Sequence, residues 1–225
     1  MKLTSMTLLS FLVMFQYANA AGNSVYVDQI GSGSTISMTQ TGNSNAIGNP
    51  TTKATINGQN NTITIDQIGD SNVTAINVQG DGVAVNSLVT GDNNNVSVAC
   101  GVSGTCTGST INNTITGDGN TVTQSAEGLT ISNVTINTNN NTVNIQNDST
   151  AVAGAKSTVL INGGGGNDVN IIQTGAAGTN GHEADLSING GTNTVDIKQG
   201  GMVDSKVIST ITGSGNTLTI KSNHN

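Results

Sequence analysis

The only residues able to do sulfur chemistry are Cys100 and Cys106. Two cysteines six residues apart in an exported chain most often close a local disulfide, and the intervening Gly-Val-Ser-Gly-Thr is flexible enough to allow it. A redox or metal role is less favoured, because the chain has no Cys-x-x-Cys spacing and no histidine near the pair. The pair therefore predicts a structural disulfide.

One group of residues suggests acid–base chemistry: His182, Glu183 and Asp185. The two histidines, His182 and His224, fall in a predicted loop and at the terminus, and three polar residues in a Gly-rich loop are usually solvated. No Gly-rich phosphate loop can be placed between a strand and a helix, because no helix is expected. We therefore expect that the chain is not an enzyme and needs no cofactor.

A glycine run at 163–166, followed by Asn167 and Asp168, resembles one toxin-type calcium-binding nonapeptide repeat. The motif occurs once, and Asn170 occupies the position that should hold a large apolar residue. Calcium binding is a minor alternative, and we predict no metal site.

Most of the remaining polar chemistry is that of side-chain amides, which stand in a repeated phrase. The phrase reads apolar or Gln, any residue, Gly, two residues, Asn, any residue, apolar, and it recurs along the chain. The predicted turn glycines are Gly31, Gly58, Gly69, Gly91, Gly117, Gly164, Gly190 and Gly213. Gly and Asn tolerate the positive φ angles of a tight reversal, so each copy predicts a turn between two strands.

Alternation around the turns indicates which side chains point inward. In Asn61-Thr62-Ile63-Thr64-Ile65-Asp66-Gln67 the amides and isoleucines share one face and the charge lies on the other, because successive side chains of a strand point to opposite faces. The same parity around the other turns predicts an inward amide ladder. Its members are Asn61, Gln67, Asn72, Asn94, Asn120, Asn141, Asn167, Gln173, Asn193, Gln199 and Asn216.

A strand-turn-strand rung cannot bury its apolar face alone, but stacked rungs share a continuous core. Asn and Gln can enter that core because ladders of amide hydrogen bonds along the stack satisfy them. The prediction is an all-β fold, a β-solenoid of about seven to nine stacked rungs, occupying residues 21–225 as a single domain.

Residues 1–20 read as a secretory signal peptide, with Lys2 at its start, an apolar stretch over Met6–Phe15 and an Ala-x-Ala cleavage site. The rest of the chain has five Lys, no Arg and thirteen acidic residues, giving a net charge of −8 (5 − 13). This charge disfavours a nucleic-acid partner, which would need clustered Lys and Arg. No apolar run is long enough for an integral membrane span, so we expect a secreted, extracellular protein.

The spacing of these motifs resembles the curlin family, the subunits of bacterial curli amyloid fibres. The family pattern, Ser-x5-Gln-x-Gly-x2-Asn-x-Ala-x3-Gln, matches the spacing of Asn23, Gln29, Gly31, Ser34, Ile36 and Gln40, and that of Asn61, Gln67, Gly69 and Asn72. The resemblance is specific over residues 23–79, degenerate but in frame over 83–222, and closest to the minor, nucleating subunit. Ile, Val or Leu usually replaces the family's Ala. The repeats begin within two or three residues of the predicted cleavage site, so we do not expect the export-targeting segment that the major subunit of the family carries there.

This resemblance implies self-assembly into a fibre, other curli-type subunits as partners, and export through outer-membrane machinery. Polar caps would prevent such stacking, and the sequence indicates none at either end. Two alternatives remain open. Outward pairs Thr62/Thr64, Thr121/Thr123 and Thr217/Thr219 resemble the arrays of ice-binding β-solenoids, and a non-polymerising β-helical adhesin or phage fibre segment would share the same fold.

Overall fold

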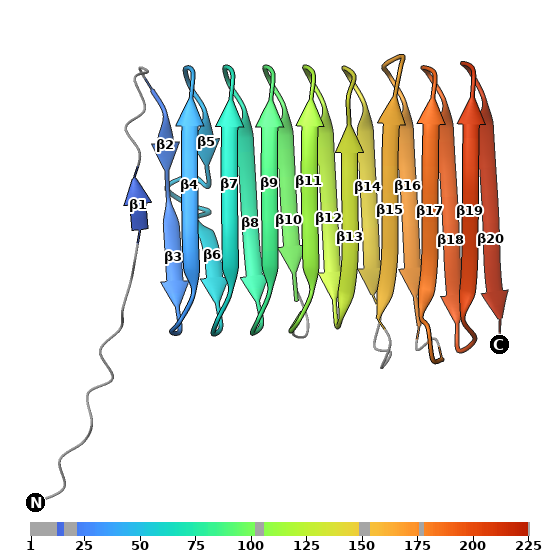
Figure 1. The fold of residues 1–225 in the computed structure, drawn as a ribbon, viewed down its shortest axis with the longest axis horizontal. Coiled ribbons are helices and arrows are strands. Elements are labelled where there is room, and N and C mark those ends of the chain that lie inside the picture. The colour runs from blue at the N-terminus through green and yellow to red at the C-terminus, as the bar shows by residue number, and fades with distance from the viewer. Residues whose placement is uncertain (1–12, 16–21, 102–105, 149–153, 176–177, 225) are drawn as a thin grey trace, which may run out of the picture.

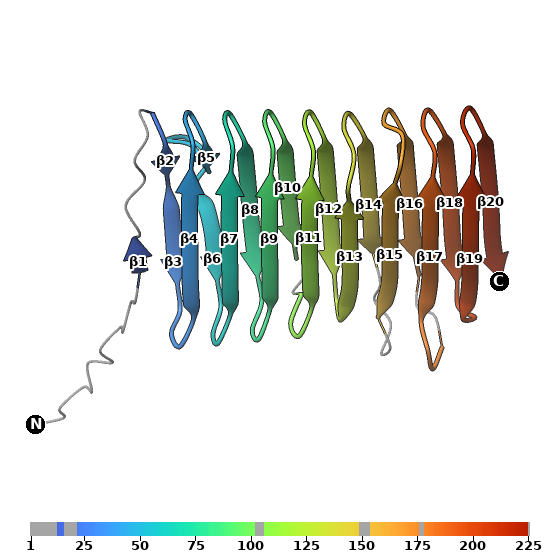
Figure 2. The same ribbon diagram turned by 45° about the horizontal axis from the view of Figure 1, so that its top comes forward.

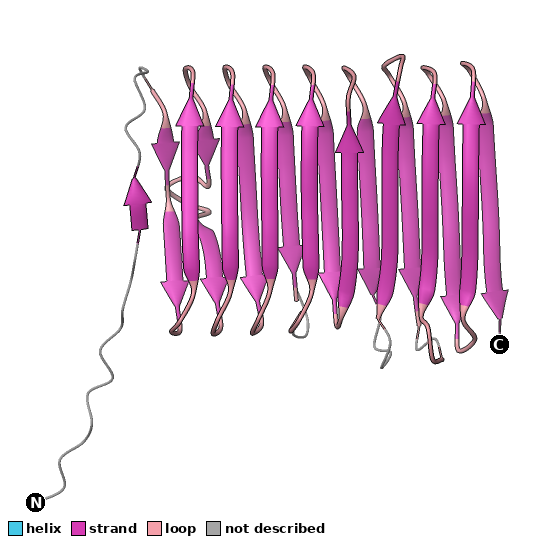
Figure 3. Cartoon of the chain, viewed as in Figure 1, coloured by secondary structure: helices cyan, strands magenta, loops and turns pink. Residues whose placement is uncertain are grey.

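The computed structural model describes residues 13–15, 22–101, 106–148, 154–175 and 178–224. Every regular element in this part of the chain is a strand, and none is a helix, so no segment there meets the length and hydropathy of a membrane-spanning helix (Figure 3). The predicted signal peptide falls mostly outside the described residues. Within it only β1 (Val13–Phe15) is described, and it lies beside β4.

The strands form two parallel sheets, here called sheet A and sheet B, which run side by side along the long axis (Figure 1). Sheet A has the order β1, β4 (Thr35–Thr41), β7 (Thr62–Ile68), β9 (Ala84–Thr90), β11 (Thr110–Thr116), β13 (Thr130–Ile136), β15 (Ala155–Asn162), β17 (His182–Asn189) and β19 (Ser205–Thr212). Sheet B has the order β2 (Ser24–Val25), β5 (Ala46–Ile47), β8 (Val73–Gln79), β10 (Asn95–Cys100), β12 (Thr121–Glu127), β14 (Thr142–Asp148), β16 (Asp168–Thr174), β18 (Thr194–Gly201) and β20 (Thr217–His224). It also contains β3 (Val27–Ile30) and β6 (Ala54–Asn57), which pair with each other, and β6 pairs with β8 as well.

The chain alternates between the sheets, so each strand of sheet A and the following strand of sheet B make one turn of a β-solenoid (Figure 2). The turns from sheet A to sheet B lie along one edge, here called the Asn edge, and the connections back to sheet A lie along the other, here called the return edge. All neighbouring strands are parallel and in register. The prediction of an all-β solenoid of stacked strand-turn-strand rungs is confirmed.

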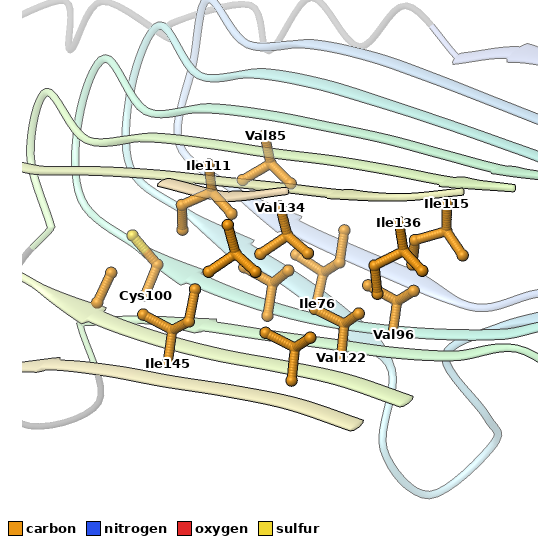
Figure 4. Packing of buried hydrophobic residues seen from close by; sticks show 14 of the residues in the cluster. Ile76, Val85, Val96, Cys100, Ile111, Ile115, Val122, Val134, Ile136 and Ile145 are labelled. Carbon is orange, nitrogen blue, oxygen red and sulfur yellow. The ribbon is translucent and has the colours of Figure 1, made fainter. Parts of the chain in front are cut away.

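Aliphatic side chains fill the space between the sheets (Figure 4). One inward column of sheet B runs through Val96, Val122, Val143, Val169 and Val195, each aligned with the next by the strand register and each at most 1% exposed. The core needs no aromatic side chains, because β-branched residues of equal size repeat at the spacing of the strands, about 4.8 Å.

The turn glycines allow neighbouring turns to approach closely. Gly91 has φ = 121°, and a Cβ atom there would collide with the carbonyl oxygen of Gly117 in the next turn. Gly69 stands in the same relation to Gly91. These positions therefore need glycine both for the backbone conformation and for the distance between turns.

Cys100 and Cys106 form a disulfide with a Cα–Cα distance of 5.4 Å. Both cysteines are buried, and Cys100 lies in an inward column of sheet B between Val78 and Ala126. The bond closes the return-edge connection between β10 and β11, where the backbone N–H of Cys106 donates to the carbonyl of Gln79 at 3.0 Å. It ties a connection to the stack rather than joining two separate rungs.

Candidate functional site

A continuous column of asparagines runs along the Asn edge, and we call it the Asn column. Its members are Asn23, Asn45, Asn72, Asn94, Asn120, Asn141, Asn167, Asn193 and Asn216. At every step the Oδ1 atom of one asparagine accepts the backbone N–H of the next, at 2.9–3.1 Å. The column therefore crosses every tier of the solenoid without interruption.

The Nδ2 atoms complete the column. From Asn94 onward each Nδ2 donates to the preceding Oδ1 atom at 2.8–3.1 Å. Several also donate to the carbonyl of the glycine that opens the next turn, as Asn94 does to Gly117 at 2.7 Å. These bonds give buried amides the partners they require. Because the accepting oxygen always serves the following tier, the column has a direction along the solenoid axis.

The structure distributes the predicted inward amides over several places. Asn72, Asn94, Asn120, Asn141, Asn167, Asn193 and Asn216 stand in the Asn column, which Asn23 and Asn45 extend. Gln67 lies in sheet A and accepts from Gln40 at 2.8 Å, whereas Gln173 and Gln199 pair in sheet B at 2.8 Å. Asn61 lies at the return edge, where its Oδ1 accepts from the N–H of Val83.

The turn glycines divide in the same way. Gly31 and Gly58 belong to return-edge connections, while Gly69, Gly91, Gly117, Gly164, Gly190 and Gly213 open turns at the Asn edge. Identical local phrases thus occupy opposite edges of the molecule.

Asn216 differs from the other members of the Asn column, because it is exposed in the last turn.

A column of carboxylates lies outside the Asn column. Asp70, Asp92 and Asp118 stand in successive turns, and each Oδ1 accepts a backbone N–H from the preceding turn: Asn43 to Asp70 at 2.6 Å, Asp70 to Asp92 at 2.7 Å and Asp92 to Asp118 at 2.8 Å. Asn139 Oδ1 accepts the backbone N–H of Asp118 in the same manner at 2.9 Å. Within the described residues no group of three His, Cys, Asp or Glu side chains has an arrangement that could hold a metal ion.

The expectation that His182 is solvated in a loop is wrong. His182 is the first residue of β17 and is 1% exposed, with Nδ1 2.8 Å from the Ser205 Oγ and Nε2 3.2 Å from the Thr174 carbonyl oxygen. Since a carbonyl oxygen can only accept, Nε2 donates to the Thr174 carbonyl, and the Ser205 hydroxyl, which can donate or accept, lies against Nδ1. Glu183 points to the outer face, so the structure does not bring the two together.

Glu183 lies between two lysines on the outer face of sheet A. Its carboxylate is 2.8 Å from Lys206 Nζ and 3.2 Å from Lys156 Nζ, and the three residues are aligned on neighbouring strands. Hydrogen bonds from Lys206 and then Lys156 lower the pKa of Glu183. This Lys–Glu–Lys column shows that the spacing of the tiers suits ion pairing along the axis.

Sequence reasoning missed a polar cluster in the middle of the core. Ser87 and Asn113 are aligned on neighbouring strands of sheet A, and Gln124 Nε2 donates to Ser132 Oγ at 2.8 Å. The Ser87 hydroxyl, both Asn113 amide atoms and Gln124 Oε1 are buried without a hydrogen-bond partner among the described residues. Strand parity was the signal that could have found Asn113, since it places this residue on the inward face.

No family model, curated protein or solved structure matches this chain.

The two ends of the described solenoid are open sheet edges. Beyond β20 no described strand continues sheet B, and none precedes β2 and β3 at the opposite end. Leu218 and Ile220 are only partly buried, although Val195 and Ile197 at the same positions in the preceding turn are 1% and 0% exposed. An open edge with half-covered apolar side chains can accept another strand.

The threonine pairs considered for ice binding are separated. Thr62 and Thr64 lie in β7 of sheet A, whereas the other two pairs, Thr121/Thr123 and Thr217/Thr219, lie in sheet B. Three strands, β14, β16 and β18, separate those two pairs. The three pairs do not form one regular array.

Proposed function

We propose that this chain is a structural subunit of an extracellular, curli-like amyloid fibre. The β-solenoid itself is compatible with a fibre subunit or an adhesin-like structural protein. The fibre proposal adds that the subunit is secreted, that it stacks with other copies or with other curli-type subunits, and that outer-membrane machinery exports it. Its role would be in biofilm matrix and surface adhesion, and not in catalysis.

One observation carries the proposal: two in-register parallel sheets end in unpaired edges at opposite ends of the described residues. A parallel, in-register stack of similar strands already has the geometry of cross-β structure. Adding a further copy at an edge repeats the strand pairing that holds the turns together within one copy. Proteins that remain monomeric commonly cover or disrupt such edges.

The Asn column supports the same proposal. Its bonds are formed between tiers, and each one needs a neighbouring tier to be complete. At an open end the amide of Asn216 is left exposed to water, and docking of another tier would bury and pair it. Separation of the threonine pairs on two sheets disfavours the ice-binding alternative.

The test uses the chain from Ala21 to Asn225, purified as a monomer and incubated at tens of micromolar. The proposal expects fibres by electron microscopy, thioflavin binding and a cross-β diffraction pattern with a meridional spacing of about 4.8 Å. A chain that has the solenoid circular dichroism spectrum but stays monomeric for days would contradict the proposal. Such a result would favour a non-polymerising, adhesin-like structural protein instead.

A further inference from the structure

We propose that copies dock head to tail in a single register, with β20 of one copy beside β2 and β3 of the next and Lys221 ion-paired with Asp28 of the next copy. This inference rests on the proposed fibre function and specifies the junction between subunits. The partner is therefore a second copy of this chain, and the docking surfaces are the two open ends of sheet B.

The direction of the Asn column selects the head-to-tail arrangement. Within the solenoid the N–H of Thr194 donates to the carbonyl of Asn216, and the N–H of Asn216 donates to Oδ1 of Asn193. At the open end, the N–H of Thr217 would donate in the same way to the carbonyl of Asn23 in the next copy. The N–H of that Asn23 would donate to Oδ1 of Asn216. Two identical ends would instead place equivalent donors and acceptors against each other.

The apolar columns of sheet B continue in the same register. Val195 and Ile197 stand two and four residues after Asn193, as Leu218 and Ile220 do after Asn216. Val25 and Val27 stand two and four residues after Asn23 and are likewise only partly buried. Head-to-tail docking would therefore place Leu218 against Val25 and Ile220 against Val27, covering the half-exposed core at both ends.

The fifth residue after each asparagine points outward and carries opposite charge at the two ends. It is Lys198 in β18 and Lys221 in β20, and it is Asp28 in β3. Lys53, Lys156, Lys198 and Lys206 each form an ion pair, so within the described residues Lys221 is the lysine without a carboxylate partner. The same register that continues the Asn column thus brings the unpaired lysine beside Asp28.

Asp28 can accept a second lysine. Its carboxylate is 3.0 Å from Lys53 Nζ within its own copy, on the side toward the body of the solenoid. Lys221 would approach from the open side, so that two lysines flank Asp28. Lys156 and Lys206 flank Glu183 in a comparable way within the molecule. In sheet A the tier next to β4 is formed by β1, which lies in the predicted signal peptide, so in the mature chain from Ala21 sheet B alone carries the strand pairing of this junction.

A charge exchange tests the register. Lys221→Asp gives chains with aspartate at both positions, and Asp28→Lys gives chains with lysine at both. Each variant alone would place like charges at its junction, whereas an equimolar mixture restores opposite charges at every junction by alternation. We expect elongation of each single variant to be about three- to tenfold slower than wild type at low salt, with the mixture close to wild type. Lys198→Ser serves as the control and should elongate at the wild-type rate.

A second measurement keeps the test valid if Asp28→Lys fails to fold because it faces Lys53. A fibre of the double variant Lys221→Cys, Asp28→Cys should form disulfides between chains under mild oxidation, since directly opposed residues on adjacent strands lie within disulfide range. Lys221→Cys with Tyr26→Cys, two residues out of register, should not. If wild type forms no fibres, the proposed function fails. If wild type forms fibres but the mixture is as slow as the single variants, or both cysteine pairs cross-link equally, this register is overturned.

Discussion

At the scale of single residues, the carboxylate column at the Asn edge combines a favourable bond with an unfavourable charge. Asp92 accepts the N–H of Asp70, yet carboxylates of neighbouring turns lie on both sides of it. Asn139 occupies the next place in the column and accepts in the same way, so a neutral amide oxygen suffices there.

Asp92→Asn should therefore stabilise the protein, by about 0.3–1 kcal/mol at low salt, because it keeps the acceptor and removes repulsion with Asp70 and Asp118. Urea denaturation with and without 0.5 M salt would measure this, and the gain should shrink as salt screens the charges. Asp168→Asn is the matched control, because Asp168 lies between Thr142 and Thr194 and has no acidic neighbour in its column. An equal gain in the control would contradict the argument.

Glu183 gives a prediction about pH. Lys206 and Lys156 lower the pKa of Glu183 in the folded state below its ordinary value of 4.5, so the stability that it contributes is present above that value. That contribution is lost as the pH falls through the lower, folded-state pKa. Glu183→Gln should flatten the dependence of the unfolding free energy on pH between about 5 and 3. The effect should be small because the side chain is partly exposed to solvent, and an unchanged pH profile would show that the two lysines do not stabilise the carboxylate.

At the scale of strands and connections, local alternation was enough to predict the rungs. The parity of Asn193, Val195 and Ile197 against Asp196 and Lys198 is a property of one strand, and all three of the first set are buried. Which edge a turn occupies depends on how many strands precede it. The phrase around Gly58 and Asn61 therefore looks like the others but lies at the return edge.

Non-local contacts explain what the sequence could not show. His182 follows Gly-rich residues that suggest a loop, yet the hydroxyl of Ser205, 23 residues later, gives its ring a partner and allows β17 to begin there. The Gln124–Ser132 bond likewise joins separate turns of the solenoid. A periodic sequence predicts the contacts that repeat in every turn, but not the contacts that a single turn makes on its own.

The disulfide gives a prediction at this scale. Replacing both cysteines, Cys100→Ser with Cys106→Ser, releases the connection between β10 and β11 and leaves two hydroxyls in a buried site. We expect a loss of about 2 kcal/mol or more in unfolding free energy, from the closed loop and the buried polar groups. Hydrogen exchange should rise first in β10 and β11 and least in β17 and β18. A uniform rise across all strands would instead indicate that the bond stabilises the whole stack equally.

At the scale of the whole molecule, the solenoid is a sequence of nearest-neighbour contacts, so the position of a change along the axis decides what it disturbs. Substitutions at two members of the Asn column can distinguish an effect on folding from an effect on assembly. Asn120 is buried with tiers on both sides, whereas Asn216 is exposed in the last turn.

Asn120→Asp places a charge in the buried column and removes the Nδ2 donor, so it should destabilise the monomer by about 3 kcal/mol. Asn216→Asp also loses the Nδ2 bond to Asn193 Oδ1, but it should destabilise the monomer less than Asn120→Asp because water can solvate its carboxylate. It should slow elongation because docking would bury that charge. Denaturant titration of the monomer and seeded elongation, measured on both variants, distinguish the two effects. Equal elongation rates for Asn216→Asp and wild type would show that the end of the Asn column is not buried by a following subunit, and the proposed growth of the stack at that end would then be wrong.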